Sequence, residues 1–546
     1  MNKTTNVFLA PTILDALDVR ADRFPTRLAY RVGGREVSYG RLRAEVSGVA
    51  QVLWKCGLRP GDRCALVLPT GLDFPRAAFA VQRVGATPVA LSPSTSPGVL
   101  LRQQRYLRCT LMIVEEAVAA RLESVGAHSN SLLTVDGLRN PPSTDFSGPG
   151  VCPEDVAYIQ MTSGTTGEPK GAMISHRSLV ASLQSAMENI AIRDDDVLVS
   201  WLPHYHDFGI VRFIFGPIYF GCPVHLIPPS LMNLRDWLFT ISRVRGTITG
   251  SPDFGYRMAV KLSANDDVDL SSLRLAGNGG EPVRGRTIEQ FERRFGLRHV
   301  VRPGYGLAEA TLTVTSEQPG APIRLDAAGN VSCGRPMRGI EVKIVDSKGM
   351  EVSPGQSGEI LVRGEPVFSG YFDDPTATDK ILRDGWLHTG DLGALDRENH
   401  LYVLGRSRNM IKTAGAMIAP REVEEAVESD PEVRISAAVG VPNETLGGTE
   451  ALIVVVEIPR QVAATESVRA SLSRRISAKV KETIGIRPWN VLLVPPKTIP
   501  TTHNGKIRHG ELRDQVAAGK VVDQGTIRYE LKPMFSRKSG CDGENR

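Results

Sequence analysis

The sequence predicts an α/β protein: a large N-terminal domain of parallel-sheet α/β subdomains plus a small β subdomain, then a small mobile α+β C-terminal domain. Three observations carry this prediction. Strand-like and helix-like segments alternate over the first 150 residues, short Gly-punctuated strands begin near residue 331, and the pattern changes again after Gly405. Alternating βα units favour a parallel sheet covered by helices.

The alternation is clearest near the N-terminus. Residues 38–58 begin with a capping serine and continue with apolar residues at helical spacing, and RCALVLP (63–69) follows as a short buried strand. Residues 74–86 again have helical spacing, and TPVALSP (87–93) again suggests a strand. Segments 196–230 and 270–315 repeat this rhythm with strands that end in turn residues. We therefore expect the N-terminal domain to cover 1–404.

Two later changes of pattern mark the other parts. Short strands such as GEILVRG and NHLYVLG indicate a β subdomain over about 331–404. A helix–strand–strand–helix pattern follows and predicts a compact C-terminal domain over 405–530. The polar end SRKSGCDGENR favours a disordered tail at 531–546.

Composition excludes several classes of protein. A chain of 546 residues exceeds one ordinary core, and a net charge of +5 is too small to argue for nucleic acid or anionic membrane. The seven cysteines are scattered without a CxxC pair, so neither a disulfide framework nor a zinc site is indicated. We expect no signal peptide, because the N-terminus has no apolar core of that length before charges appear, and the apolar run 451–456 is far below the ~20 residues of a transmembrane helix. We expect a cytoplasmic protein without a transmembrane segment.

The stretch TSGTTGEPKG (162–171) carries the densest chemistry of the chain. It lies between two strand-like segments, VAYIQMT and AMISH. Its glycines let backbone amides crowd around an anion, its hydroxyls add donors, and Lys170 adds a positive charge. Neither GxxxxGK[ST] nor GxGxxG can be aligned here, so the loop predicts a different phosphate grip from those two. The alternative is a flexible Ser/Thr/Gly linker.

Four further motifs fit one site with this loop. GYGLAEAT (304–311) offers Glu309, a lone carboxylate suited to Mg²⁺ beside a polyphosphate, and HTGDLG (388–393) places Asp391 on a turn, where it suits ribose hydroxyls. GRSRNMIK (405–412) puts basic residues at a domain boundary, and NGKIRHGELR (504–513) presents Lys506 on a glycine turn. Each motif alone also fits an ordinary turn or surface loop.

In order and spacing these motifs resemble the adenylate-forming superfamily, which includes acyl-CoA synthetases, luciferases and peptide-synthetase adenylation domains. The resemblance covers nearly the whole chain to Lys506. WLPHYHDFGIVRFIFGPIYF (201–220), SPDFGYRMAVKL and LRLAGNGGEPVRGRTIEQFERRFG are most similar to fatty acyl-AMP ligases. One departure concerns the interval 315–331, which is shorter than the insertion that such ligases usually carry. It leaves open whether the acyl acceptor is a carrier protein or CoA.

The resemblance implies ATP and Mg²⁺ as cofactors and a role for each motif. Lys506, His206 and Glu309 are the expected catalytic residues, and Glu309 with Thr162 would bind the metal. The remaining residues fall into three sets. ATP would contact Thr162, Ser163, Gly164, Thr165, Thr166, Gly167, Lys170, Gly280, Glu281, Tyr305, Gly306, Asp391 and Arg406; the acyl pocket would use Phe208, Gly209, Phe213, Phe254, Leu307 and Thr311; the hinge and second step would use Arg408 and Lys412.

Three functional hypotheses remain. The first is a fatty acid–AMP ligase that makes acyl-AMP and loads an acyl carrier protein, and the second is a fatty acyl-CoA synthetase with the same first step. The short 315–331 interval favours the second, and the HYHDFG neighbourhood favours the first. The third is a non-catalytic acyl or nucleotide sensor, against which the retention of Lys170, Glu309, Asp391 and Lys506 speaks. His206 could instead be a core histidine bonded to backbone, and the apolar stripe around it could be plain core.

Overall fold

The computed structural model describes residues 10–162, 169–230, 233–263, 266–413, 416–443, 450–459, 465–501 and 507–521. The chain divides into two compact units, Met1–Leu404 and Gly405–Arg546. The tail expected at 531–546 lies outside the described residues.

A long mixed sheet of the first unit is parallel through its centre. Its outer strands β2, β14 and β15 run antiparallel to their neighbours. Between β11 and β12 the register sets Gly250 opposite Gly277. The order is β15 (Arg335–Pro336), β14 (Leu312–Ser316), β13 (Val301–Leu307), β12 (Leu275–Asn278), β11 (Ile248–Ser251), β9 (Leu198–Ser200), β10 (Val224–Leu226), β1 (Leu28–Val32), β2 (Arg35–Ser38).

The second sheet of this unit holds the strands on either side of the TSGTTGEPKG stretch. β7 and β8 form an antiparallel hairpin at one side of a parallel set. The order is β18 (Gly370–Tyr371), β8 (Lys170–Ser175), β7 (Val156–Thr162), β4 (Thr87–Ala90), β3 (Arg63–Val67), β5 (Cys109–Val114), β6 (Leu132–Thr134). The prediction of parallel-sheet α/β subdomains is therefore confirmed.

Helices begin where the sequence provides caps. Thr12 and Asp15 form a reciprocal capping box at α1, and the Ser38 side chain accepts the Arg41 N–H at α2. One hydrophobic core takes buried side chains from both sheets, including Leu66 and Val224. The helices of this unit are α1 (Ile13–Arg23), α2 (Tyr39–Lys55), α3 (Asp73–Arg83), α4 (Pro97–Tyr106), α5 (Glu116–Glu123), α6 (His176–Asn189), α7 (Asp207–Gly209), α8 (Gly216–Phe220), α9 (Leu234–Val244), α10 (Asp253–Leu262), α11 (Gly285–Phe295) and α12 (Pro375–Ile381).

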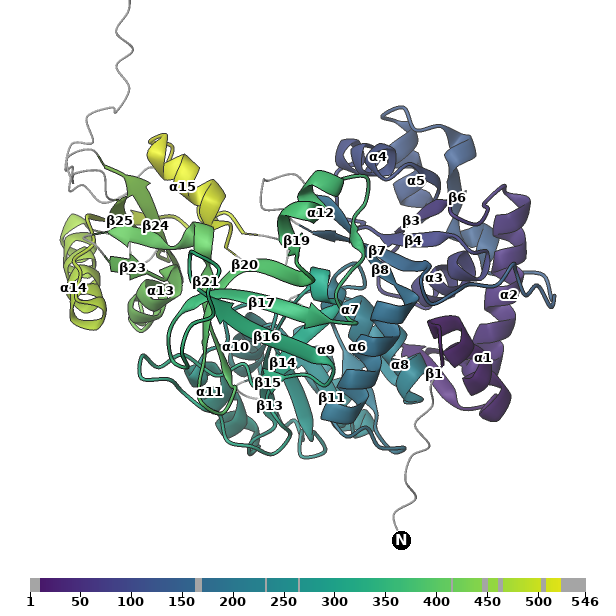
Figure 1. Ribbon diagram of the computed structural model, residues 1–546, viewed down its shortest axis with the longest axis horizontal. Helices are drawn as coiled ribbons and strands as arrows, with labels where there is room; N and C mark the ends of the chain where they lie inside the picture. Colours follow the sequence, from purple (N-terminus) through teal and green to yellow (C-terminus); the bar gives the residue numbers. More distant parts are fainter. Residues whose placement is uncertain are drawn as a thin grey trace, which may run out of the picture. The chain divides into compact units, whose positions relative to one another are not determined.

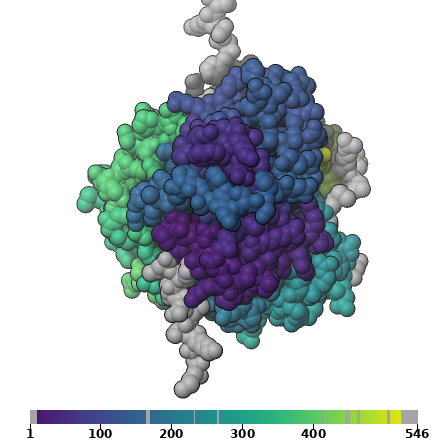
Figure 2. Space-filling view, turned by 90° about the vertical axis from the view of Figure 1, so that its right-hand side faces the viewer, coloured from purple at the N-terminus to yellow at the C-terminus, as the bar shows by residue number. Residues whose placement is uncertain are grey.

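The N-terminal helices cover one face of this unit. In Figure 2 the purple residues at the start of the chain lie beside the blue residues that follow them, over the same face. A π-helical segment, Ile210–Phe215, connects α7 to α8 without a break. A single turn of π-helix inside an α-helical run is frequently found at functional sites.

The β subdomain is an antiparallel sheet at the end of the first unit. β16 pairs with β17, β17 with β20, and β20 with both β19 and β21. A register shift between Glu359 and Leu361 bulges β20 around Gly390, whose φ is +69°. The strands are β16 (Ile340–Val345), β17 (Gly358–Gly364), β19 (Leu382–Arg383), β20 (Trp386–Leu395) and β21 (Leu401–Arg406).

The second unit is a small α+β structure. β24 (Ile435–Pro442), β25 (Glu450–Glu457) and β26 (Asn490–Val494) form a sheet beside the hairpin β22 (Ile411–Thr413) and β23 (Ala416–Ile418). Alternate β24 residues face opposite sides: Ala438 packs with α13 (Pro420–Glu428) and α14 (Glu466–Ile484), and Val439 packs with α15 (His509–Ala517). Figure 1 shows α14 and α15 on opposite sides of these strands.

Two further features are the cysteines and the apolarity of the helices. Cys56, Cys64, Cys109, Cys152, Cys222 and Cys333 are free thiols, and Cys541 lies outside the described residues. Within the described ranges, no helix is long and apolar enough to cross a membrane.

Candidate active site

The β7–β8 hairpin holds the ends of the phosphate-binding loop predicted from the sequence. Thr162 lies opposite Lys170 in the ladder, and its hydroxyl donates to the Lys170 carbonyl at 3.4 Å. Ser163, Gly164, Thr165, Thr166 and Gly167 lie outside the described residues. A tight approach follows at Gly171, where a Cβ would lie 2.9 Å from both Ile159 and Leu107 side chains. The strand ends that flank the loop therefore belong to a closely packed sheet.

Lys170 already has an anionic partner. Its Nζ lies 3.2 Å from Oδ2 of Asp374 and 5.1 Å from the centre of the Tyr371 ring. Asp374 caps α12 by accepting the Ala377 N–H, and this bond together with Lys170 holds the pKa of Asp374 below its ordinary value. The lysine is therefore held by an aromatic face in β18 and by the cap of α12, the helix that follows β18 in the chain.

Tyr371 also reaches the predicted metal ligand. Its hydroxyl donates to Oε1 of Glu309 at 2.6 Å, and the Phe368 N–H donates to the Glu309 carbonyl. Glu309 lies in a 3-10 turn, Ala308–Ala310, between β13 and β14. With Oε1 engaged, Oε2 is the oxygen that fits a magnesium ion, which takes one or two carboxylates and keeps several waters. Across the described residues, no group of three or more His, Cys, Asp or Glu gathers as a metal cluster.

The predicted ribose and adenine residues meet between two sheets, since Tyr305 lies on β13 and Asp391 on β20. Tyr305 of β13 donates its hydroxyl to Oδ2 of Asp391 at 2.6 Å. The expectation that Asp391 lies on a turn is wrong: it follows Gly390 in the bulge inside β20, and its N–H donates to the Thr389 hydroxyl. The bulge breaks the strand alternation, and the hydroxyl of Tyr305 then reaches the carboxylate.

The GNGGEP loop follows β12. A Cβ on Gly279 would lie 2.9 Å from the Gly304 carbonyl, so this loop lies against the start of the GYG segment. Gly280 has φ +82°, which favours glycine. The Glu281 carboxylate accepts the Phe254 N–H at the start of α10. Burial, with the nearby Asp253 charge adding to it, raises the pKa of Glu281 to about 7.

His206 lies at the start of α7 rather than in the core. Its Nδ1 is 2.6 Å from Oδ1 of Asp207, and its side chain is 39% exposed. The Gln160 amide of β7 donates to the Tyr205 carbonyl at 3.0 Å, which ties this segment to the loop-bearing hairpin. Nδ1 also accepts the Phe208 N–H at 3.3 Å, so this ring nitrogen is held at the start of α7.

The residues predicted to line an acyl pocket divide by burial. The Phe208 ring covers the paired glycines, so a Cβ on Gly250 would lie 2.6 Å from it and one on Gly277 3.6 Å. Phe208 and Phe254 are partly exposed. Four others are buried: Gly209, Phe213, Leu307 and Thr311. Thr311, with φ +50°, donates its hydroxyl to the Pro366 carbonyl, and Gly209 leaves no room for a Cβ beside the Pro203 carbonyl.

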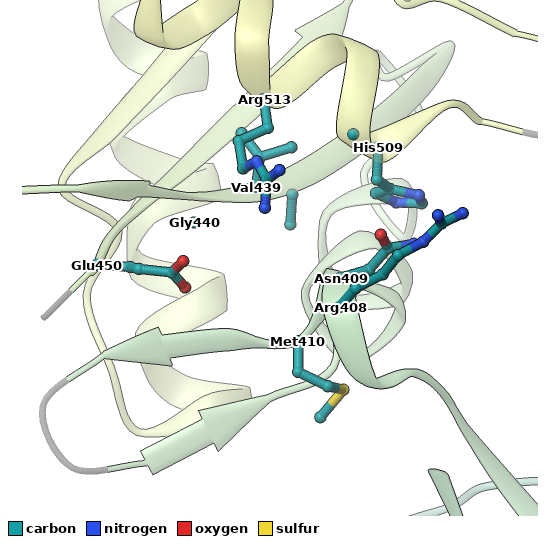
Figure 3. Close-up of a pocket in the computed structure, with 10 residues that line it drawn as sticks. Arg408, Asn409, Met410, Val439, Gly440, Glu450, His509 and Arg513 are labelled. Carbon is teal, nitrogen blue, oxygen red and sulfur yellow. The ribbon is translucent and has the colours of Figure 1, made fainter. Parts of the chain in front are cut away.

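Other predicted residues belong to the second unit. Arg406 ends β21, Arg408 lies in a 3-10 turn, and the Lys412 N–H donates to Glu450 at 2.7 Å. Figure 3 shows Arg408, His509 and Arg513 around a small hollow of this unit, which holds about 10 Å³, room for one water. Lys506 lies outside the described residues. The roles of these residues therefore stay predictions.

Sequence reasoning missed Tyr371 and Asp374. Both lie in GYFDDPTATDK (370–380), where Asp before Pro signals a helix start. That signal locates α12 but not its partners, because Tyr371 is 62 residues from Glu309.

Comparisons with known proteins identify the family of this chain. Residues 17–372 match the family described as AMP-binding enzyme. The chain is 30% identical to the medium-chain-fatty-acid–[acyl-carrier-protein] ligase JamA of Moorena producens (strain JHB), over 97% of this chain and 98% of the relative. It is 30% identical to the long-chain-fatty-acid–CoA ligase of Escherichia coli O157:H7, over 93% and 95%. A solved structure from a study of fatty acyl-adenylate ligases of E. coli and L. pneumophila aligns with a TM-score of 0.84 at 28% identity, covering 94% and 98%.

Proposed function

Since the chain belongs to the AMP-binding enzyme family, we propose that it activates a fatty acid with ATP and passes the acyl group to the phosphopantetheine thiol of an acyl carrier protein. The relatives that span nearly its whole length are fatty-acid ligases. One of them is named for an acyl-carrier-protein acceptor and another for CoA. The free thiols of the described residues agree with the reducing cytoplasm that we propose for the enzyme.

One observation carries the proposal. Tyr371 contacts both Lys170 and Glu309, which come from the loop-bearing hairpin and the YGLAE segment. A cation suited to phosphates and a carboxylate suited to magnesium are therefore neighbours, as ATP binding requires. Tyr305 and Asp391 supply a second pair suited to the nucleoside.

In the first step an oxygen of the fatty-acid carboxylate attacks the α-phosphorus of ATP. The bond from that phosphorus to the bridging oxygen breaks, and pyrophosphate leaves with the electron pair. Lys170, with Thr162 and the loop, holds the β- and γ-phosphates, and Asp391 and Arg406 hold the ribose. Magnesium on Glu309 would neutralise phosphate charge. Lys506 bridges carboxylate and α-phosphate as negative charge develops.

In the second step a thiol sulfur attacks the acyl carbonyl carbon. The bond from that carbon to the AMP oxygen breaks, AMP leaves, and the thiol proton passes to solvent. Adenylation of the fatty acid makes this attack possible, because AMP is a far better leaving group than oxide. Arg408 and Lys412 are the proposed residues of this step.

The second candidate is an acyl-CoA synthetase. The segment between β14 and β15 favours it, because it is short and tied down: the Arg302 guanidinium donates to the Ala321 carbonyl, and Asp326 closes a turn with Asn330. No large insertion is present there to oppose a CoA-using arrangement.

Mass spectrometry of products tests the proposal. The enzyme is incubated with ATP, Mg²⁺ and a panel of fatty acids, with either CoA or a phosphopantetheinylated carrier protein. Acyl-AMP that persists with CoA and discharges onto the carrier supports the ligase. Rapid acyl-CoA formation selects the second candidate. Absence of adenylate with every acid, from folded protein, refutes both.

A further inference from the structure

Arg212 is an isolated charge inside the π-helical segment Ile210–Phe215. Its neighbours Val211, Phe213, Ile214 and Phe215 are buried and apolar. Burial lowers the pKa of Arg212 to about 10, so the guanidinium stays protonated at neutral pH. No carboxylate contributes to that shift. By contrast, the buried Arg302 has Glu292 and Glu317 acting on its pKa.

The hydrogen bonds of Arg212 are also incomplete. Its Nη2 donates to Oγ1 of Thr313 on β14 at 3.1 Å. Its Nη1 is buried and finds no hydrogen-bond partner among the described residues. A partly buried cation without an anion or a full set of acceptors is unfavourable. A ligand that brings an anion would relieve that cost.

Arg212 lies where the sequence predicts the acyl pocket. It is one helical turn after Phe208, on the same side of the segment. Its partner Thr313 pairs across β13 and β14 with Gly306. Solvent reaches Arg212 and Thr313, although the residues on either side of each are buried. Both side chains therefore keep some exposure to solvent within packed elements.

The substrate carboxylate that attacks ATP does not fit the position beside Arg212. We place it near His206, an expected catalytic residue, which is the N-cap of this helical run and lies six residues before Arg212. Six residues span about 9 Å along a helix axis. A substrate that reaches from His206 to Arg212 and pairs with the guanidinium therefore needs a second anionic group on its chain.

We propose, on the basis of the proposed function, that Arg212 and Thr313 bind a second carboxylate of the acyl substrate, which is therefore a dicarboxylic acid. The planar guanidinium offers two parallel N–H donors to a carboxylate. The Thr313 hydroxyl accepts from Nη2 and so orients the guanidinium. A few polar groups in an apolar pocket commonly fix ligand orientation in this way.

Matched substrates test this assignment. Adenylation is measured by pyrophosphate release with monocarboxylic, ω-hydroxy and α,ω-dicarboxylic acids of equal chain length. We expect the wild-type protein to prefer the diacid by about 10- to 100-fold in kcat/KM, the range of a charged hydrogen-bonded pair. Arg212→Leu should lose that preference and should have a higher kcat/KM than the wild type with the monocarboxylic acid. Arg212→Lys should keep part of it, and Thr313→Val should weaken it.

Arg105→Leu, at an exposed arginine of α4, is the matched control and should keep the wild-type preference. Equal rates with monoacid and diacid, a preference for the hydroxy acid, or an unchanged preference in Arg212→Leu would overturn the assignment. If no acid is adenylated, the proposed function fails, and calorimetric titration of the diacid without ATP decides the role of Arg212. Binding that Arg212→Leu abolishes supports the site, and absent or equal binding refutes it.

Discussion

Replacing Tyr371 by Phe removes one hydroxyl from the centre of the candidate site. The ring that faces Lys170 at 5.1 Å stays, so the change isolates the 2.6 Å hydrogen bond to Glu309. Hydrogen bonds to charged groups contribute about 1.5–3 kcal/mol, which corresponds to roughly 10- to 100-fold. Tyr371 is buried, but Glu309 is partly exposed, so we expect a loss of about 10- to 30-fold in kcat/KM for ATP, the lower part of that range.

The assay is fatty-acid-dependent exchange of pyrophosphate into ATP, measured over a magnesium titration. Because Tyr371 holds the carboxylate that we assign to magnesium, Tyr371→Phe should need more magnesium for half-maximal rate. Tyr402→Phe is the matched control. The Tyr402 hydroxyl donates to Asp396 at 3.3 Å within the β subdomain, and this hydrogen bond does not involve Glu309. Unchanged kcat/KM and magnesium dependence in Tyr371→Phe, or equal losses in both variants, would refute the reasoning.

Three other changes have defined outcomes. Lys170→Met should raise the KM for ATP by about 10- to 100-fold through loss of a phosphate contact, and an unchanged KM in the same exchange assay would contradict the assignment. Because the pKa of Glu281 is raised from 4.5 to about 7, its contribution to folding stability is present below pH 4.5 and is lost as pH rises through 7. Glu281→Gln should therefore flatten the pH dependence of the unfolding free energy over this range, measured by urea unfolding. A pH dependence parallel to that of the wild type would be inconsistent with this. Gly250→Ala puts a Cβ 2.6 Å from the Phe208 ring and should cost about 1–3 kcal/mol of stability. Gly277→Ala puts its Cβ 3.6 Å from the same ring and should be tolerated. Equal unfolding midpoints of the two variants would show that the ring moves aside.

Periodicity and caps predicted most of the elements. The helix expected over 38–58 is α2, and the strands expected on either side of the TSGTTGEPKG stretch are β7 and β8. Such features depend on residues close in sequence, because a cap or an apolar face involves neighbours within a few turns. The bulge that carries Asp391 was missed, since it depends on the register between β17 and β20.

The sequence by itself determined which chemical groups are present and which local elements hold them: a loop between two strands with Thr162 and Lys170 at its ends, and a carboxylate at Glu309. Only the tertiary structure decided their partners. Tyr371 meets Glu309 across 62 residues, Tyr305 meets Asp391 across 86, and Arg212 meets Thr313 across 101. Local patterns cannot specify such contacts, because they arise where distant strands and helices pack against one another to bury their apolar faces.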